Sequence, residues 1–319
     1  MDVDITILGP ISMTLGGRPV PLGDRKRRTL FAILALERGL VGKSRLIQLL
    51  WPEEHAPKDP DGQLHTYVNH LRKALREVAP GSEKMLETLR NVGYQLQVEP
   101  YAVDCHRFRQ LASQAKRALE RDPARAAQDG RAALAAWGTP AGVRGGTPLE
   151  AVEPQLELIT EGLRQEYQAA LMTCLHAELK CGGHEQLLPE LARLASYDEY
   201  GAENQELARI RMLATYRSGN RTEALKIYDH LRDRLQDSLA AEPDEETRKL
   251  RRRIMIDDPE LQLPRTDDQV GDGEKPDGKE NERPAGHVFN QTAETINIVD
   301  RMEAETINLG TFLENRRPR

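Results

Sequence analysis

Side chains that can read bases or bind phosphate gather in the first hundred residues of this 319-residue chain. The segment 60–78 is the clearest case, because polar and cationic residues recur on one face at helical spacing. These residues are His65, Thr66, Asn69, Lys73 and Arg76. A helix fits the major groove of DNA, where short hydrogen-bonding side chains can distinguish base pairs. We expect the first four residues to contact bases and Arg76 to contact phosphate; the alternative is an ordinary solvated face.

Two further groups of cations flank this segment. The run Arg25-Lys26-Arg27-Arg28 leads into an apolar stretch and predicts a helix with a basic first turn. Cations there oppose the helix dipole, a small cost that a nearby phosphate would offset. Arg90 begins the turn of a predicted hairpin, in which we expect Gly93 to supply a positive φ. Arg25, Lys26, Arg27 and Arg90 are therefore expected to join Arg76 as phosphate contacts.

Other arrangements of reactive residues give weaker evidence of a functional site. The segment 39–44, Gly-Leu-Val-Gly-Lys-Ser, resembles a phosphate-binding loop, but Glu37 stands where that loop needs glycine and no strand precedes it. We interpret the segment as a loop that enters a helix. Cys174, His176, Cys181 and His184 match no zinc-binding spacing. The sequence predicts no catalytic residues, metal site or cofactor, and hence a protein that is not an enzyme.

The elements around the cations have the order of a winged helix. Alternating apolar residues predict short strands between residues 3 and 15, and helices follow over about 25–36, 43–51 and 60–78. The last helix has an apolar stripe opposite its polar face. Two alternating segments, 86–89 and 94–98, then predict the hairpin. We assign residues 1–98 to a winged-helix DNA-binding domain.

The segment 99–256 has an all-helical pattern. The expected helices cover 104–121, 123–136, 149–181, 184–196, 203–218, 221–240 and 244–256. Residues 179–188 superpose on residues 216–225 at an offset of 37, which resembles the period of about 34 in tetratricopeptide repeats. Stacked repeats of this kind form a concave surface that binds partners.

The segment 257–319 differs in composition from both. It has 8 Lys+Arg and 15 Asp+Glu, and residues 257–287 contain too few apolar side chains to fold. We therefore predict a disordered acidic tail. Within it, the sequence AETIN occurs twice, and the two copies predict strands that could assemble in a cross-β manner with themselves or with a partner. The expected assembly residues are Ile296, Asn297, Ile298, Ile307, Asn308 and Leu309. The alternatives are a chance echo, or a strand that docks onto the protein's own repeats.

Charge and cysteine content are consistent with a DNA-binding protein in a reducing compartment. The chain carries a net charge of −6, yet residues 1–98 have 14 Lys+Arg and 11 Asp+Glu. Three cysteines form no disulfide framework and fit buried thiols. No apolar run is long enough to span a membrane, and the first residues lack the pattern of a secretory signal. We expect a cytoplasmic, nucleoid-associated protein.

Several motifs, in the same order, resemble the OmpR-type DNA-binding domain and bacterial transcriptional activator domain of the Streptomyces antibiotic regulatory proteins. The N-terminal motifs are Ile7-Leu8-Gly9-Pro10, Arg45-Leu46-Ile47, Leu50-Trp51, Thr66 to Arg72 and Arg90 to Leu96. Those of the helical segment are Val103-Asp104, Arg107-Phe108, Trp137 to Pro140, Tyr216 to Gly219, Glu223 to Leu225 and Glu242-Pro243. The chain departs from the family at Gly42, where a capping Ser is common, and at His70, where Arg is frequent, so the usual target sequence is not carried over.

This resemblance implies a transcriptional activator that binds direct repeats in double-stranded DNA and recruits RNA polymerase. We expect a homodimer on DNA. Family members usually activate biosynthetic gene clusters for secondary metabolites. The expected fold is mainly α: a winged helix (α+β), an all-α tetratricopeptide-like domain and a disordered tail. Two alternatives are a protein-binding scaffold or adaptor and a switch driven by nucleoside triphosphates; the incomplete phosphate-binding loop argues against the second.

Overall fold

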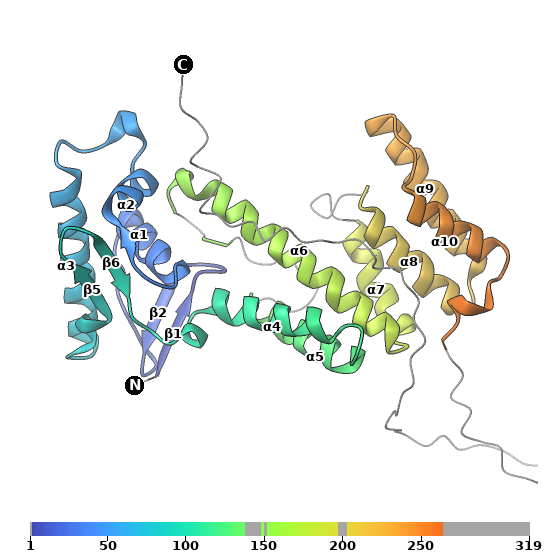
Figure 1. The fold of residues 1–319 in the computed structure, drawn as a ribbon, viewed down its shortest axis with the longest axis horizontal. Coiled ribbons are helices and arrows are strands. Elements are labelled where there is room, and N and C mark those ends of the chain that lie inside the picture. Colours follow the sequence, from blue (N-terminus) through green and yellow to red (C-terminus); the bar gives the residue numbers. More distant parts are fainter. Residues whose placement is uncertain (1, 138–147, 150–151, 197–202, 264–319) are drawn as a thin grey trace, which may run out of the picture. The chain divides into compact units, whose positions relative to one another are not determined.

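The computed structural model describes residues 2–137, 148–149, 152–196 and 203–263 (Figure 1). Two small sheets and three helices come first, and helices make up nearly all of the rest. The predicted fold class, a winged helix followed by an all-α repeat-like region, is confirmed. Residues 1–257 form one compact unit, and a second begins at Asp258. The AETIN repeats, with their expected assembly residues, lie outside the described residues.

An antiparallel sheet forms where apolar and polar residues alternate. Its strands are β1 (Val3–Thr6), β2 (Ser12–Leu15) and β3 (Arg18–Pro19), paired in that order. Ile5, Met13 and Leu15 are buried because alternate side chains of each strand point to the same face. The alternation between residues 3 and 15 thus predicted β1 and β2.

Three helices follow, at the positions that the sequence predicts: α1 (Arg25–Leu36), α2 (Lys43–Leu50) and α3 (Pro60–Val78). The side chains of Asp24 and Asp59 cap α1 and α3 by accepting hydrogen bonds from the N–H groups of Arg27 and Gly62. Such caps satisfy N–H groups that have no partner inside the helix. Residues 29–36 of α1 are all buried, so this helix forms the centre of the winged-helix core.

A second sheet contains a strand that the sequence did not predict. Its strands are β4 (Val41–Gly42), β5 (Leu86–Leu89) and β6 (Gly93–Leu96), in the order β4-β6-β5. Residues 39–44 were expected to form only a loop. In the structure, Val41 and Gly42 pair with Tyr94 and Gly93 before α2 begins. Two residues are too few to show an alternating pattern, so only the pairing reveals this strand.

Seven helices make up most of the remaining described chain. They are α4 (Asp104–Ala118), α5 (Pro123–Ala135), α6 (Glu157–Lys180), α7 (His184–Ala195), α8 (Gln205–Arg217), α9 (Arg221–Leu239) and α10 (Glu245–Met255). Their positions agree with the prediction except at the start of α6, which was expected at residue 149. A 3-10 turn, Pro154–Leu156, precedes α6 instead. Proline lacks the N–H group that a continuing helix requires, so the regular helix starts beyond Pro154.

The internal repeat has a structural counterpart in two turns. Gly182 lies between α6 and α7 with φ +84°, and Gly219 lies between α8 and α9 with φ +82°. In both turns the residue after the glycine donates a backbone hydrogen bond to a carbonyl five residues earlier, Gly183 to Glu178 and Asn220 to Thr215. Left-handed backbone favours glycine, so the 37-residue offset reflects two helix pairs that turn in the same way.

The cysteines are less uniform than expected. Cys105 and Cys174 are buried, and burial raises the pKa of both thiols to about 12. Cys181 is exposed, contrary to the prediction of buried thiols, because it sits in the turn after α6. Trp51 and Trp137 are buried, and Trp137 packs edge-on against Phe108 and Tyr167.

The helices α4 to α10 form the helical half of the protein. The carboxylate of Asp104, at the start of α4, joins this half to the segment that follows β1. It is 2% exposed and accepts hydrogen bonds from the N–H groups of Ile7 and Leu8 at 2.9–3.0 Å. Burial raises its pKa to about 6, although these N–H donors and that of Cys105 act in the opposite direction. Beside it, the ring of His106 lies 3.0 Å from the carbonyl oxygen of Ala35 on α1, and burial lowers the pKa of His106 to about 4.

These two groups should give stability opposite pH dependences. The raised pKa of Asp104 contributes stability that is present below about pH 4 and is lost as the pH rises through 6. The lowered pKa of His106 contributes stability that is present above pH 6.5 and is lost as the pH falls towards 4. Between pH 4.5 and pH 6.5, the free energy of unfolding of Asp104→Asn should rise by roughly 2–3 kcal/mol, because only the contribution of His106 remains. Over the same range, that of His106→Gln should fall by a similar amount, because only the contribution of Asp104 remains.

Urea unfolding of the full chain at both pH values measures this. In the wild type the two contributions partly cancel, so its unfolding midpoint should change less with pH than that of either variant. Parallel pH profiles for all three proteins would contradict the assignment.

Candidate nucleic-acid interface

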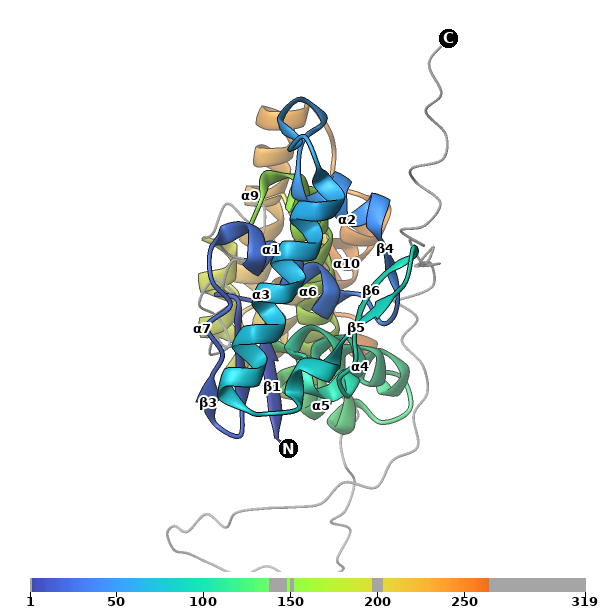
Figure 2. The same cartoon turned by 90° about the vertical axis from the view of Figure 1, so that its left-hand side faces the viewer.

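Helix α3 exposes the face that the sequence predicts to contact DNA. Its apolar stripe packs inward, with Leu64, Val68, Leu71, Ala74 and Leu75 buried. The opposite face carries His65, Thr66, Asn69, Lys73 and Arg76, all exposed. Figure 2 views the molecule from the side of α3, with the β5–β6 hairpin beside the helix. The fold thus brings the predicted base-reading residues together on one accessible surface.

Arg72 fixes this helix to the hairpin. Its guanidinium donates hydrogen bonds to the carbonyl oxygen of Leu86 at 2.7 and 3.0 Å and to the hydroxyl of Thr88 at 2.7 Å. Both partners lie on β5, so one side chain sets the position of the hairpin relative to α3. Sequence analysis gave Arg72 no role. Its position between the polar and apolar faces of α3 is the only signal that could have suggested one.

The hairpin corresponds to the wing. Arg90, Asn91 and Val92 connect β5 to β6, and all three are exposed. Arg76 lies near the other end of α3, 3.4 Å from the carboxylate of Glu83, and remains 62% exposed. Arg90 and Arg76 are therefore both exposed cations of the winged helix.

The prediction that Gly93 supplies a positive φ in the wing turn was wrong. Positive φ in the wing turn occurs at Asn91, at +61°, whereas Gly93 is the first residue of β6 and has no positive φ. Gly93 is needed for another reason: a Cβ there would lie 2.8 Å from the carbonyl carbon of Val41 and closer still to its oxygen. The close approach of β4 to β6 requires glycine at this position.

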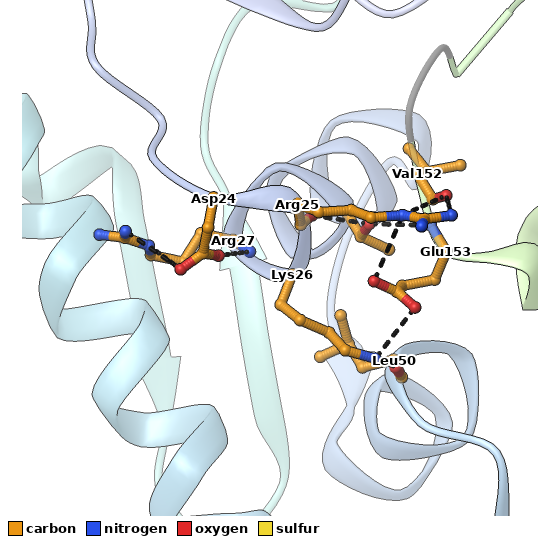
Figure 3. Close-up of polar contacts among 8 residues, drawn as sticks. Asp24, Arg25, Lys26, Arg27, Leu50, Val152 and Glu153 are labelled. Carbon is orange, nitrogen blue, oxygen red and sulfur yellow. Dashed lines mark hydrogen bonds and ion pairs between the residues drawn. The ribbon is translucent and has the colours of Figure 1, made fainter. Parts of the chain in front are cut away.

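The basic first turn of α1 is divided between two directions (Figure 3). Lys26 lies 3.1 Å, and Arg25 3.5 Å, from the carboxylate of Glu153, which is 12% exposed. Arg25 also donates a hydrogen bond to the carbonyl oxygen of Val152, and Thr29 accepts one from the N–H of Glu153. These two cations thus share a single intramolecular carboxylate. The structure does not place Arg25 and Lys26 with the polar face of α3.

Arg27 points the other way, towards α3. Its guanidinium contacts the carboxylate of Asp24 at 3.1 Å and lies 3.4 Å from Nδ1 of His70. Of the three cations predicted in this turn, Arg27 alone is placed beside α3 by a contact of its side chain.

A shallow hollow separates the wing turn from the start of α2. It is lined by Gly42, Lys43, Ser44, Ile47, Asp61, Asn91 and Val92. Lys43 faces the carboxylate of Asp61 at 3.4 Å, so its charge is balanced within the protein. Within the described ranges, no group of three or more potential ligands could hold a metal ion, and no helix is long and apolar enough to cross a membrane.

Comparisons with known proteins agree with this arrangement. Residues 17–96 match the family "Transcriptional regulatory protein, C terminal", and residues 103–255 match the "Bacterial transcriptional activator domain". The transcriptional regulator RedD of Streptomyces coelicolor is 31% identical over 82% of this chain and 73% of its own length. The regulatory protein DnrI of Streptomyces peucetius is 30% identical over 81% of this chain and 93% of its own.

The chain belongs to the Streptomyces antibiotic regulatory protein family. A solved structure of EmbR from Mycobacterium tuberculosis, in complex with a low-affinity phosphopeptide, has the same fold. Its TM-score is 0.72 at 27% identity, and the match covers 81% of this chain and 66% of that one. As a member of the antibiotic regulatory family, the chain is a transcriptional regulator, and its N-terminal domain is of the OmpR type.

The tight contact at Gly93 makes a prediction about the wing. Gly93→Val should push β6 away from β4, destabilise the winged helix by about 1–3 kcal/mol and disable DNA binding, while the helical half keeps its structure. Gly42→Ala is a matched control, because a Cβ there meets nothing closer than 3.9 Å. Circular dichroism and duplex binding measure both effects. Full DNA affinity in Gly93→Val would contradict the role of this contact.

Proposed function

We propose that this regulator is a sequence-specific, DNA-binding activator of transcription. In this proposal α3 enters the major groove, where His65, Thr66, Asn69 and Lys73 contact bases. Arg76 and Arg90 bind phosphates on either side, and Arg27 contributes from α1. The observation that carries the proposal is the exposed polar face of α3, which Arg72 holds in a fixed relation to the wing.

The phosphate contacts first expected for Arg25 and Lys26 are not part of this proposal. Both cations contact the carboxylate of Glu153, and in Figure 3 both side chains extend from α1 on the side opposite to Arg27. Moving both cations to phosphates would leave the carboxylate of Glu153, 12% exposed, without its cationic partners. We propose instead that Arg25 and Lys26 hold the winged helix and the helical half together.

The helical half is proposed to contact RNA polymerase. Its successive helix pairs offer side chains from several elements to a protein partner, which is the usual role of such repeats. Activation of a biosynthetic gene cluster, binding to direct repeats as a homodimer and a location with the nucleoid in the cytoplasm are proposed on the basis of family membership. RedD and DnrI, named as regulators, support the class of function.

Salt dependence distinguishes this proposal from a protein-binding scaffold. The affinity for a duplex selected in vitro should fall steeply with salt, because bound cations release counterions from DNA. Lys73→Ala and Arg90→Ala should each reduce the slope of log K against log salt by about one unit. Lys116→Ala, on the exposed face of α4, is the control and should leave the slope unchanged. A chain without salt-dependent duplex affinity would favour the scaffold.

Residues that read bases should behave differently. Thr66→Ala and Asn69→Ala should change the preferred base at one position of the selected duplex, with a loss of about 1–3 kcal/mol per contact, and should leave the salt slope intact. In vitro selection with each variant measures the preference. If both variants select the wild-type sequence with unchanged affinity, the assignment of α3 as the reading helix is wrong.

A further inference from the structure

Arg27 and His70 form a pair of nitrogen-bearing side chains between α1 and the edge of α3. Nη1 of Arg27 lies 3.4 Å from Nδ1 of His70. The carboxylate of Asp24 holds the other side of the guanidinium, 3.2 Å from Nε and 3.1 Å from Nη2. Figure 3 shows Asp24 and Arg27 on the side of α1 that faces α3. The guanidinium is thereby oriented, with Nη1 towards the histidine.

The chemistry of the two groups restricts their protonation. Arginine is a donor only and keeps its proton, so His70 can accept from Nη1 only if its Nδ1 carries none. With Nε2 also protonated, a proton on Nδ1 would place a second cation 3.4 Å from the first. That arrangement becomes favourable when an anion accepts hydrogen bonds from both groups, because opposite charge stabilises the protonated imidazole.

The position of the pair indicates which anion that is. His70 is exposed and directly follows Asn69, and Lys73 lies one turn further along α3. The pair therefore borders the face that we propose to read bases. When a helix lies in the major groove, the groups at its edge meet the sugar–phosphate backbone. A backbone phosphate has two free oxygens and can accept from Arg27 and His70 together.

We infer that Arg27 and His70 form one phosphate-binding site, in which His70 takes up a proton when DNA binds. The hydrogen bond between the two residues breaks, a proton from solvent occupies Nδ1 of His70, and both groups donate to the phosphate. This inference rests on the proposed DNA binding and adds to it a specific role for His70, at a position where the family frequently has Arg. It also makes DNA affinity depend on pH, because the site takes up a proton when it binds the phosphate.

Two charged groups on α1 and α3 next to this pair have partners of their own. Asp24 is shared with Arg27 and with the backbone of α1, and Lys73 faces Glu77 at 3.9 Å on its own helix. His65 lies on the polar face of α3, which is the face expected to contact bases. It is the residue that could mimic the effect, and it provides the matched control.

The test measures the affinity of the full chain for an in vitro selected duplex at pH 6.0 and pH 8.0, at constant salt. The wild type should bind about three- to tenfold more tightly at pH 6.0. His70→Gln should lose this difference, and His65→Gln should keep it. His70→Arg, which places a permanent cation beside Arg27, should bind equally at both pH values. Titration calorimetry in two buffers of different ionisation enthalpy should detect proton uptake in the wild type that is absent in His70→Gln.

The outcomes separate the inference from the proposed function. Equal wild-type affinity at both pH values, or a pH dependence that survives in His70→Gln and vanishes in His65→Gln, overturns the inference and leaves DNA binding intact. Failure of the wild type to bind any duplex at either pH overturns both. Circular dichroism of each variant establishes that it is folded before its affinity is compared.

Discussion

The buried carboxylate of Asp104 determines how the two halves of the protein are connected. Two backbone N–H groups of the segment after β1 would lack partners without it, and an unpaired buried donor costs about 1–3 kcal/mol. Because Asp104 is the first residue of α4, satisfying these donors also fixes where the helical half begins. The parallel bridge between Ile5 and Val103 and the contact of His106 with Ala35 reinforce the same connection.

A second connection between the two halves is made by residues 149, 152 and 153, which precede α6. Glu153 and Val152, just before α6, bind Arg25 and Lys26 on α1, and the N–H of Leu149 donates to the carbonyl oxygen of Ile7. The first turn of α1 therefore has two tasks, divided between neighbouring residues. Arg25 and Lys26 contact the helical half, and Arg27 faces α3, the helix proposed to read DNA.

Sequence reasoning located the helices well because their evidence is local. The apolar stripe of α3 and its exposed polar face follow from spacing alone, as do most helix ends. It failed where a distant residue decides the outcome. Glu153 lies more than a hundred residues from Arg25, and the need for glycine at position 93 comes from the backbone of Val41 rather than from the turn. Arg72 was missed for the same reason, because its partners are on another strand.

The matching turns at Gly182 and Gly219 limit how this region can change in length. Each turn sets the direction in which the next helix leaves, through a backbone conformation that other residues adopt only with strain. An insertion of one or two residues within a helix would rotate every later residue by about 100° per position and turn its apolar stripe away from its neighbour. Gain or loss of a whole helix pair preserves each stripe. The region is therefore built to grow or shrink in steps of about 37 residues, and to resist smaller changes.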